Sequence, residues 1–282
     1  MNLNKITWVA SFPKSGNTWV RMLISAYYSG GVVNINKPAF TGVDDMQLYF
    51  YNCVSPIDTN RLEEAQKVLL RPAALMHLCA LIDDRNPLFV KTHCANCQIY
   101  GNNVIPQPIT KKAIYIVRDP RDIAISLADH MGESLDMAIA MMNEDRYALN
   151  DESGMFQQVS SWSFNVKSWT SETSFPVHVM RYEDMISDPH AVFTDLIKFL
   201  DLPLDETLLN KSIEATSFNS LKSQEDEFGF REKSNKQKRF FTNGRAGVWK
   251  DILTDEQARR IEHDHKEIMK KFNYTKGKTK NE

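Results

Sequence analysis

The chain has 282 residues and a formal net charge of −2, a length that suits one large α/β domain and a charge that argues against a general nucleic-acid binder. Its four cysteines are too few for a disulfide scaffold, no apolar run approaches the length of a membrane span, and no charged-then-apolar leader opens the sequence. We therefore expect a cytoplasmic protein with reduced thiols that binds neither nucleic acid nor membranes.

The first predicted unit is a strand, a tight loop and a helix. The apolar run 6–10 leads into Ser11-Phe12-Pro13-Lys14-Ser15-Gly16-Asn17-Thr18-Trp19, and apolar side chains then recur at helical spacing. Such a loop points backbone N–H groups and the positive end of a helix dipole at one spot. With the charge of Lys14 and the donors on Ser15, Asn17 and Thr18, this is chemistry for holding a phosphate or a similar oxyanion. The order differs from the common nucleotide P-loop, in which lysine follows the glycines.

The next stretch, residues 32–57, shows no clear periodicity and is rich in aromatic side chains. An irregular segment of this length is often a functional wall or lid, and an ordinary surface insertion with buried aromatics is an equal alternative. We then expect a capped helix over residues 60–70, a short buried strand over 88–90 and a polar loop over 94–110.

The clearest strand is the apolar run 113–117, after which Asp119 fits a helix N-cap and Pro120 the first helical position. Further helices are predicted over 135–142, 156–170, 189–202, 205–215 and 254–272, and a strand over 177–182. The last helix opens with the capping box Thr254-Asp255-Glu256-Gln257. Residues 222–247 are charged and punctuated by glycine, which indicates a mobile segment, and the basic tail 274–282 is expected to be disordered.

This order of elements predicts an α/β fold in which a single domain over residues 1–273 has a central parallel sheet flanked by helices. Ligands of such sheets bind outside the carboxyl ends of the strands. The Lys14 loop, the segment Lys91-Thr92-His93, Arg118 and Tyr182 each follow a predicted strand. We therefore expect them to form one shared site.

Several motifs in order give the chain a family resemblance. The opening loop, Lys91-Thr92-His93, the segment 116–126, Arg181-Tyr182-Glu183-Asp184-Met185, Thr216-Ser217-Phe218 and Gly244-Arg245-Ala246-Gly247-Val248-Trp249-Lys250 resemble those of the cytosolic sulfotransferases, from about residue 7 to residue 254. These enzymes transfer a sulfuryl group from 3′-phosphoadenosine-5′-phosphosulfate (PAPS) to a small-molecule acceptor and release adenosine 3′,5′-bisphosphate (PAP). The residue pattern of the segment 113–142 is more similar to that of the bacterial branch of the family than to that of the animal branch.

The resemblance implies three catalytic residues. His93 would be the general base that deprotonates the acceptor hydroxyl or amine, a role that an unperturbed pKa near 6.5 allows. Lys14 would stabilise charge on the departing phosphate oxygen, and Lys91 would lie near the sulfuryl group. The lysines would do what magnesium does in kinases, so no metal is expected.

The resemblance also implies a donor site with two ends. The 5′ end would be held by Lys14, Ser15, Gly16, Asn17 and Thr18, and the 3′-phosphate by Arg118 and Ser126. The adenine would lie among Trp19, Tyr182, Thr216 and Phe218. Judged without the family, Arg118 is a candidate for a salt bridge with Asp119 or Asp122, and Trp19 and Phe218 are candidate core residues.

The sequence departs from the family near its C-terminal loop. Thr242-Asn243-Gly244 stands where the family has Arg-Lys-Gly, so two cations that bind the 3′-phosphate are missing. We expect Asn243 and Gly244 still to contact the donor, and Arg245 to compensate from the other side of Gly244. Asp255 and Arg259 replace the Val and Glu of a dimer motif of the animal enzymes, so that dimer is not carried over and the oligomeric state stays open.

Cys94 and Cys97 adjoin His93 and raise two alternatives, metal binding and redox control. Because no second ligand pair accompanies them, no metal site is expected, and thiol oxidation that perturbs His93 is the remaining hypothesis. The acceptor pocket is expected to be lined by the 222–240 stretch and by Phe40, Tyr49, Phe50, Tyr51, Met131 and Met155, which hints at a lipophilic or phenolic acceptor.

Two other functions compete with sulfuryl transfer. A P-loop kinase would share the strand–loop–helix cradle, but the chain has no Gly-x-x-x-x-Gly-Lys-Ser/Thr and no acidic residue with an evident claim on magnesium. A non-catalytic nucleotide-binding protein is the second alternative. The presence of Lys14, Lys91 and His93 together argues against a decayed site.

Overall fold

The computed structural model describes residues 3–150, 155–171 and 173–275. Its centre is a five-stranded parallel sheet in the order β2-β3-β1-β6-β9. These strands are β1 (Ile6–Ser11), β2 (Val43–Asp44), β3 (Leu88–Thr92), β6 (Thr110–Val117) and β9 (Val177–Arg181). Two small antiparallel hairpins accompany it, β4 (Gln98–Ile99) with β5 (Asn102–Asn103) and β7 (Ala148–Asn150) with β8 (Phe156–Gln158).

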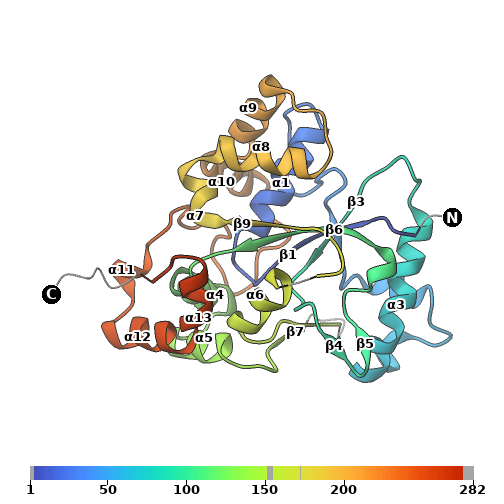
Figure 1. Ribbon diagram of the computed structural model, residues 1–282, viewed down its shortest axis with the longest axis horizontal. Helices are drawn as coiled ribbons and strands as arrows, with labels where there is room; N and C mark the ends of the chain where they lie inside the picture. Colours follow the sequence, from blue (N-terminus) through green and yellow to red (C-terminus); the bar gives the residue numbers. More distant parts are fainter. Residues whose placement is uncertain (1–2, 151–154, 172, 276–282) are drawn as a thin grey trace.

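Helices cover both faces of the sheet (Figure 1). On one side lie α1 (Asn17–Tyr28), α7 (Tyr182–Ser187), α8 (Pro189–Phe199), α9 (Glu206–Ala215) and α10 (Phe218–Phe228). The other side carries α4 (Pro120–Met131), α5 (Leu135–Met142), α6 (Trp162–Thr170), α12 (Asp255–Asp264) and α13 (Lys266–Lys271). The remaining elements are α2 (Leu48–Asn52), α3 (Glu64–Leu81), α11 (Trp249–Ile252) and the 3-10 turns Thr59–Arg61 and Gln107–Ile109. The α/β fold with a central parallel sheet is thereby confirmed.

The two layers follow from alternation along the strands. On β1, Trp8 and Ala10 pack into the core beneath α3–α6, whereas Val9 packs against α1, α8 and α9. All three side chains have no exposed surface. Because successive side chains of a strand point to opposite faces, a continuously apolar strand is what a sheet covered on both sides requires.

Several predicted helix starts are confirmed in atomic detail. The Asp119 carboxylate accepts the Arg121 N–H at 3.0 Å, with Pro120 in the first turn. Thr254 and Gln257 form both halves of the capping box at α12. A cap of this kind contributes about 1 kcal/mol to helix stability because it satisfies an N–H that the helix leaves unpaired.

The predicted boundaries of two other helices, over 60–70 and 156–170, are wrong. Helix α3 begins at Glu64 and runs past Pro72 to Leu81, because Leu75, Leu78 and Cys79 are buried against the sheet and their burial outweighs one missing backbone hydrogen bond. Residues 156–158 form a strand rather than a helix, and α6 starts only where the Ser161 hydroxyl caps it.

Two segments predicted to be irregular carry structure. Residues 32–57 contain the edge strand β2 and the helix α2. Residues 222–228 complete α10, in which Glu225 is buried and accepts the N–H groups of Phe240 (2.6 Å) and Phe241 (2.9 Å). These bonds fasten Phe240 and Phe241, which lie in the segment predicted to be mobile, to α10. Of the tail predicted to be disordered over 274–282, Tyr274 is buried and its hydroxyl donates to Glu183 at 2.8 Å, so the prediction is wrong there; residues 276–282 lie outside the described residues. Within the described ranges, no helix is long and apolar enough to cross a membrane.

Candidate functional site

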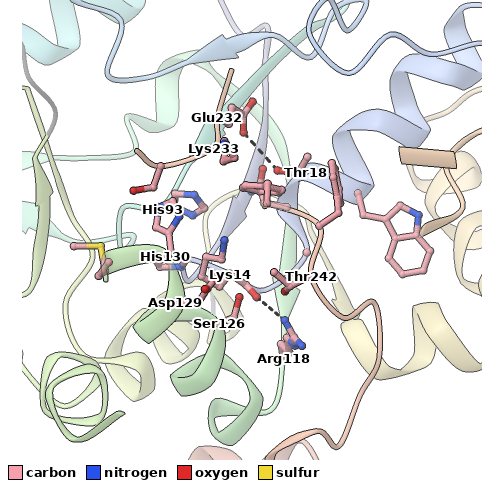
Figure 2. Close-up of a pocket in the computed structure, with 18 of the residues that line it drawn as sticks. Lys14, Thr18, His93, Arg118, Ser126, Asp129, His130, Glu232, Lys233 and Thr242 are labelled. Atoms are coloured by element: carbon pink, nitrogen blue, oxygen red, sulfur yellow. Dashed lines mark hydrogen bonds between the residues drawn. The ribbon is translucent and has the colours of Figure 1, made fainter. Parts of the chain in front are cut away.

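A cavity of about 1150 Å³ opens at the carboxyl edge of the sheet (Figure 2). It is lined from the ends of β1, β3, β6 and β9, so the predicted convergence of these strand ends is what the structure has. Most of the predicted site residues line it: Lys14, Gly16, Asn17, Thr18, Trp19, Lys91, His93, Arg118, Ser126, Tyr182, Thr216, Phe218, Asn243 and Gly244. Ser15 is fully buried beside the cavity rather than lining it, and the exposed Arg245 also does not line it.

The loop between β1 and α1 is held in a conformation that needs glycine. Gly16 has a φ of 102°, and a Cβ there would lie 2.7 Å from the ring of Tyr182. The Asn17 amide donates to the Val9 carbonyl at 2.9 Å, and its oxygen accepts from Arg21 at 2.9 Å. Asn17 therefore fastens α1 to β1, and its side-chain amide is engaged within the protein.

Lys14 is half-buried in this loop and lines the cavity. Its ammonium lies 4.3 Å from the centre of the Phe240 ring. Burial, assisted by the charges of Arg118 and Lys91, lowers the pKa of Lys14 to about 8. An anion in the cavity would meet a poorly solvated cation, which is where a single charge has its greatest effect.

His93 is held as a neutral imidazole with a defined tautomer. Its Nδ1 lies 2.8 Å from the Ser11 carbonyl oxygen, which can only accept, so Nδ1 carries the proton and Nε2 carries the lone pair. Burial, together with the charge of Lys91, lowers the pKa of His93 to about 3. The ring is therefore neutral at neutral pH and presents a lone pair on Nε2.

Lys91 belongs to a network of charges beside His93. Its Nζ lies 2.9 Å from Asp44 and 3.9 Å from Glu232, and Glu232 also accepts from Arg21 at 2.6 Å. Burial opposes ionisation of both carboxyls, but Lys91 holds the pKa of Asp44 below its usual range, and Arg21 with Lys91 lowers that of Glu232 to about 2. All four groups are charged at neutral pH, which fixes Lys91 at the edge of the cavity.

Arg118 bridges two distant parts of the chain. Its Nη1 donates to the Lys14 carbonyl at 3.0 Å and its Nη2 to the Arg245 carbonyl at 3.4 Å, while the guanidinium lies 4.2 Å from the centre of the Tyr182 ring. The alternative salt bridge to Asp119 or Asp122 is not formed: Asp119 pairs with Arg121, and Asp122 accepts backbone N–H groups at residues 247 and 249. The Arg118 Nε is buried without a partner, a donor left for a ligand.

The aromatic end of the cavity is tightly built. Trp19 contacts Tyr182 edge-on, with ring centres 6.1 Å apart, and its buried Nε1 has no partner. Gly244 has a φ of 57°, and a Cβ there would lie 2.3 Å from the ring of Phe218. Only glycine lets this segment lie flat on Phe218. Thr216 is buried and donates to the Ser212 carbonyl at 2.7 Å, so it orders the wall.

His130 is a cavity residue that sequence reasoning missed. Its Nδ1 lies 2.7 Å from the Gln237 side-chain oxygen, and the Gln237 amide donates to Asp129 at 2.5 Å. Figure 2 places His130 close to His93 and Lys14. Burial, with the charges of Lys14 and Lys91, lowers its pKa. The available signal was spacing, because His130 follows Ser126 by four residues on one helix and so shares its face.

The expected aromatic lining of the acceptor pocket is wrong. Phe40, Tyr49, Phe50, Tyr51 and Met155 do not line the cavity, and of the side chains named for it only Met131 does. Tyr51 and Met155 instead pack with Ala74 of α3 in a separate cluster. Residues 231–236 and Phe240, from the 222–240 stretch, do line it, together with Asp44, Met46, Leu149 and Gln157. This end of the cavity is therefore largely polar.

The cysteine pair beside His93 consists of two thiols. Burial raises the pKa of Cys94 to about 12 and that of Cys97 to about 11, so both are protonated at neutral pH. A protonated thiol is a poor nucleophile and a poor metal ligand. No group of three or more His, Cys, Asp or Glu side chains in the described residues is arranged to hold a metal ion.

Comparisons with known proteins agree with this geometry. A family model described as the sulfotransferase domain matches residues 4–273. The chain is 25% identical over 270 residues to sulfotransferase 1B1 of Canis lupus familiaris, covering 93% of this chain and 82% of the relative. It is 26% identical over 280 residues to cytosolic sulfotransferase 3 of Arabidopsis thaliana, covering 94% and 76%. Among solved structures, retinol dehydratase in complex with androsterone and the inactive cofactor PAP is similar, with a TM-score of 0.62 and 21% identity over 96% of this chain and 82% of that one.

Proposed function

The chain belongs to the sulfotransferase family and is a PAPS-dependent sulfotransferase, and from this premise we propose that it moves the sulfuryl group of PAPS to a hydroxyl or amine of a small-molecule acceptor by in-line displacement. Family membership favours this reaction over the P-loop kinase alternative. A PAP complex of a protein with the same fold supports PAPS as the donor, and the androsterone in that complex supports a small-molecule acceptor. We further predict a cytoplasmic location.

His93 is the proposed general base. The acceptor O–H gives its proton to Nε2 of His93 as the acceptor oxygen forms a bond to sulfur and the bond from sulfur to the phosphate oxygen breaks. The electron pair of that bond leaves with PAP. The observation that carries the proposal is the neutral imidazole with its proton fixed on Nδ1 by the Ser11 carbonyl, since a base needs a free lone pair facing the substrate.

Lys14 and Lys91 are the proposed charge stabilisers. Lys14, which lines the cavity from the loop after β1, would meet the negative charge that grows on the leaving phosphate oxygen. Lys91 is held beside His93 by Asp44 and would meet the transferring group. Alignment of the two substrates by fixed groups contributes the rest of the acceleration.

The donor is proposed to lie along one side of the cavity, where Ser15, Trp19 and Arg118 each have a buried side-chain atom without a hydrogen-bond partner among the described residues. The loop of Ser15 to Thr18 faces its 5′ end, and Arg118 with Ser126 its 3′-phosphate. Trp19, Tyr182, Thr216 and Phe218 would enclose the adenine, with Asn243 and Gly244 above it. The unpaired Nε of Arg118 fits a phosphate oxygen. The exposure of Arg245 gives no support to its proposed contact with the donor.

The test is a transfer assay with radiolabelled PAPS and a panel of hydroxyl and amine acceptors, in the presence of a metal chelator. We expect PAP to form without added metal, and His93→Asn to lower kcat by about 10²–10⁴-fold with little change in PAP affinity. His77→Asn, a histidine outside the cavity, is the control. A His93→Asn enzyme that keeps more than a tenth of the wild-type kcat would overturn the assignment of the base.

A further inference from the structure

Three cations of one loop line the cavity without carboxylate partners. Arg231, Lys233 and Lys236 belong to the segment 231–236, called the cationic strap below, which lies between α10 and α11. The Lys233 ammonium donates to the Lys238 carbonyl at 3.3 Å. Across residues 3–150, 155–171 and 173–275, none of the three cations has an ion-pair partner within 4 Å. Their charges are therefore available to a ligand.

Two of the acidic side chains in the same region of the cavity are already neutralised. Asp44 is paired with Lys91 at 2.9 Å, and Glu232 with Arg21 at 2.6 Å. Asp129 accepts from the Gln237 amide. The local balance is therefore positive, although the whole chain carries a slight negative charge.

The strap crosses the cavity at the His93 end. The Arg231 guanidinium lies beside Gly42, since a Cβ there would be 3.4 Å from Nη2, and the Lys236 chain lies against Gly132 at the end of α4. Figure 2 shows Glu232 and Lys233 at one end of the cavity near His93, and Arg118 at the opposite end. Lys233 thus lies at the end at which the base would meet the acceptor, and Arg231 and Lys236 line the same cavity.

From this placement we propose that the acceptor carries an anionic group, a carboxylate, sulfate or phosphate ester, which Arg231, Lys233 and Lys236 recognise while its hydroxyl faces His93. The inference rests on the proposed function, because it names the class of acceptor for that site. A cavity of about 1150 Å³ exceeds the 300–1,000 Å³ typical of a single ligand, so donor and acceptor fit together. Three cations along one wall of the cavity attract such anions over neutral isosteres of the same shape.

The test compares matched phenols that differ only in charge. Equilibrium binding to the PAP-saturated protein is measured by calorimetry for 4-hydroxyphenylacetate, its methyl ester and 4-hydroxyphenyl phosphate, and transfer from PAPS is followed for each. We expect the better of the two anions to bind at least about tenfold more tightly than the ester at low salt, with the preference shrinking as salt rises. The triple variant Arg231→Gln, Lys233→Gln, Lys236→Gln should bring the ratio to about one. Lys238→Gln, in the same loop but outside the cavity, is the matched control and should leave the ratio unchanged.

Three results would overturn the inference: anions that bind no more tightly than the ester, a triple variant that keeps the preference, or a triple variant that weakens PAP binding as strongly as anion binding. The last would mean that the strap serves the donor. Transfer to the ester without preference for the anions would remove the inference and leave the proposed function standing. A different result would count against the proposed function: the anions bind without displacing PAP, yet no phenol receives a sulfuryl group from PAPS.

Discussion

Burial lowers the pKa of two residues of this site, with different consequences for each. Burial keeps His93 neutral and lowers the pKa of Lys14, because the charged forms of the imidazole and of the ammonium lose hydration at the cavity. For His93 the change keeps the ring neutral, with a lone pair on Nε2, whereas for Lys14 it makes the charge conditional on pH. The sequence predicted both residues from their places after strands. It did not predict that Asp44 pairs with Lys91, because the pairing depends on an edge strand of two residues.

Donor affinity should therefore depend on pH through Lys14. The pKa of about 8 means that the free protein loses this cation as pH rises through 8, and a bound phosphate would raise the pKa again. We expect PAP to bind more weakly at pH 9 than at pH 7, with uptake of about half a proton at pH 8. Calorimetry in buffers of different ionisation enthalpy measures that uptake. Lys14→Arg keeps its charge at both pH values and should abolish the pH dependence, so an unchanged dependence in this variant would exclude Lys14 as its source.

At the scale of elements, loops without regular structure complete a site that the strands begin. The strand–loop–helix unit at β1 and α1 was predictable, because its glycine, its cation and the apolar runs around it are local signals. The position of residues 229–247 was not, because the bonds that hold it join residues far apart: Glu225 binds Phe240 and Phe241, and Gln237 binds Asp129. The short hairpin of β7 and β8 was missed for the same reason, since Gln157 is ordered by the distant Asp45.

Gly244→Ala tests whether the flat contact with Phe218 builds the donor site. The added Cβ would lie 2.3 Å from the ring at a φ of 57°, so we expect loss of PAP affinity by at least about tenfold from displacement of the wall. Gly30→Ala is the matched control, because its φ of 70° carries a similar backbone strain of about 1–2 kcal/mol with nothing within 4 Å of the added carbon. Equal PAP affinities for the two variants would show that the contact is dispensable.

For the whole molecule, the sequence predicted the layers well and their boundaries less well. Continuous apolar strands alternating with helices are sufficient to indicate a parallel sheet covered on both faces. The course of α3 past Pro72 was out of reach, because burial of Leu75 and Leu78 is a property of the packed fold rather than of the segment. The same holds for the division of the last helix at His265, which is buried between α12 and α13.

His265 should make the fold sensitive to acid. Burial lowers its pKa to about 4, below the value near 6.5 of an unfolded chain, so its contribution to stability is complete above pH 6.5 and is lost as pH falls towards 4. Between pH 6.5 and pH 5 the loss is about 2 kcal/mol. In urea unfolding, the free energy of unfolding of His265→Gln should therefore fall less between pH 6.5 and pH 5 than that of the wild type. His263→Gln, which changes an exposed neighbour, should follow the wild type. Parallel declines for wild type and His265→Gln would contradict the assignment.

The bridge made by Arg118 has a consequence for the order in which the protein is built. Its guanidinium joins the carbonyl groups of Lys14 and Arg245, and Gly244 closes over Phe218. A ribosome will have finished the central sheet, whose last strand ends at Arg181, before the residues that roof the cavity emerge. The residues that roof the cavity are thus synthesised after every strand of the sheet, so the nucleotide site can close only once the segment around Gly244 has emerged.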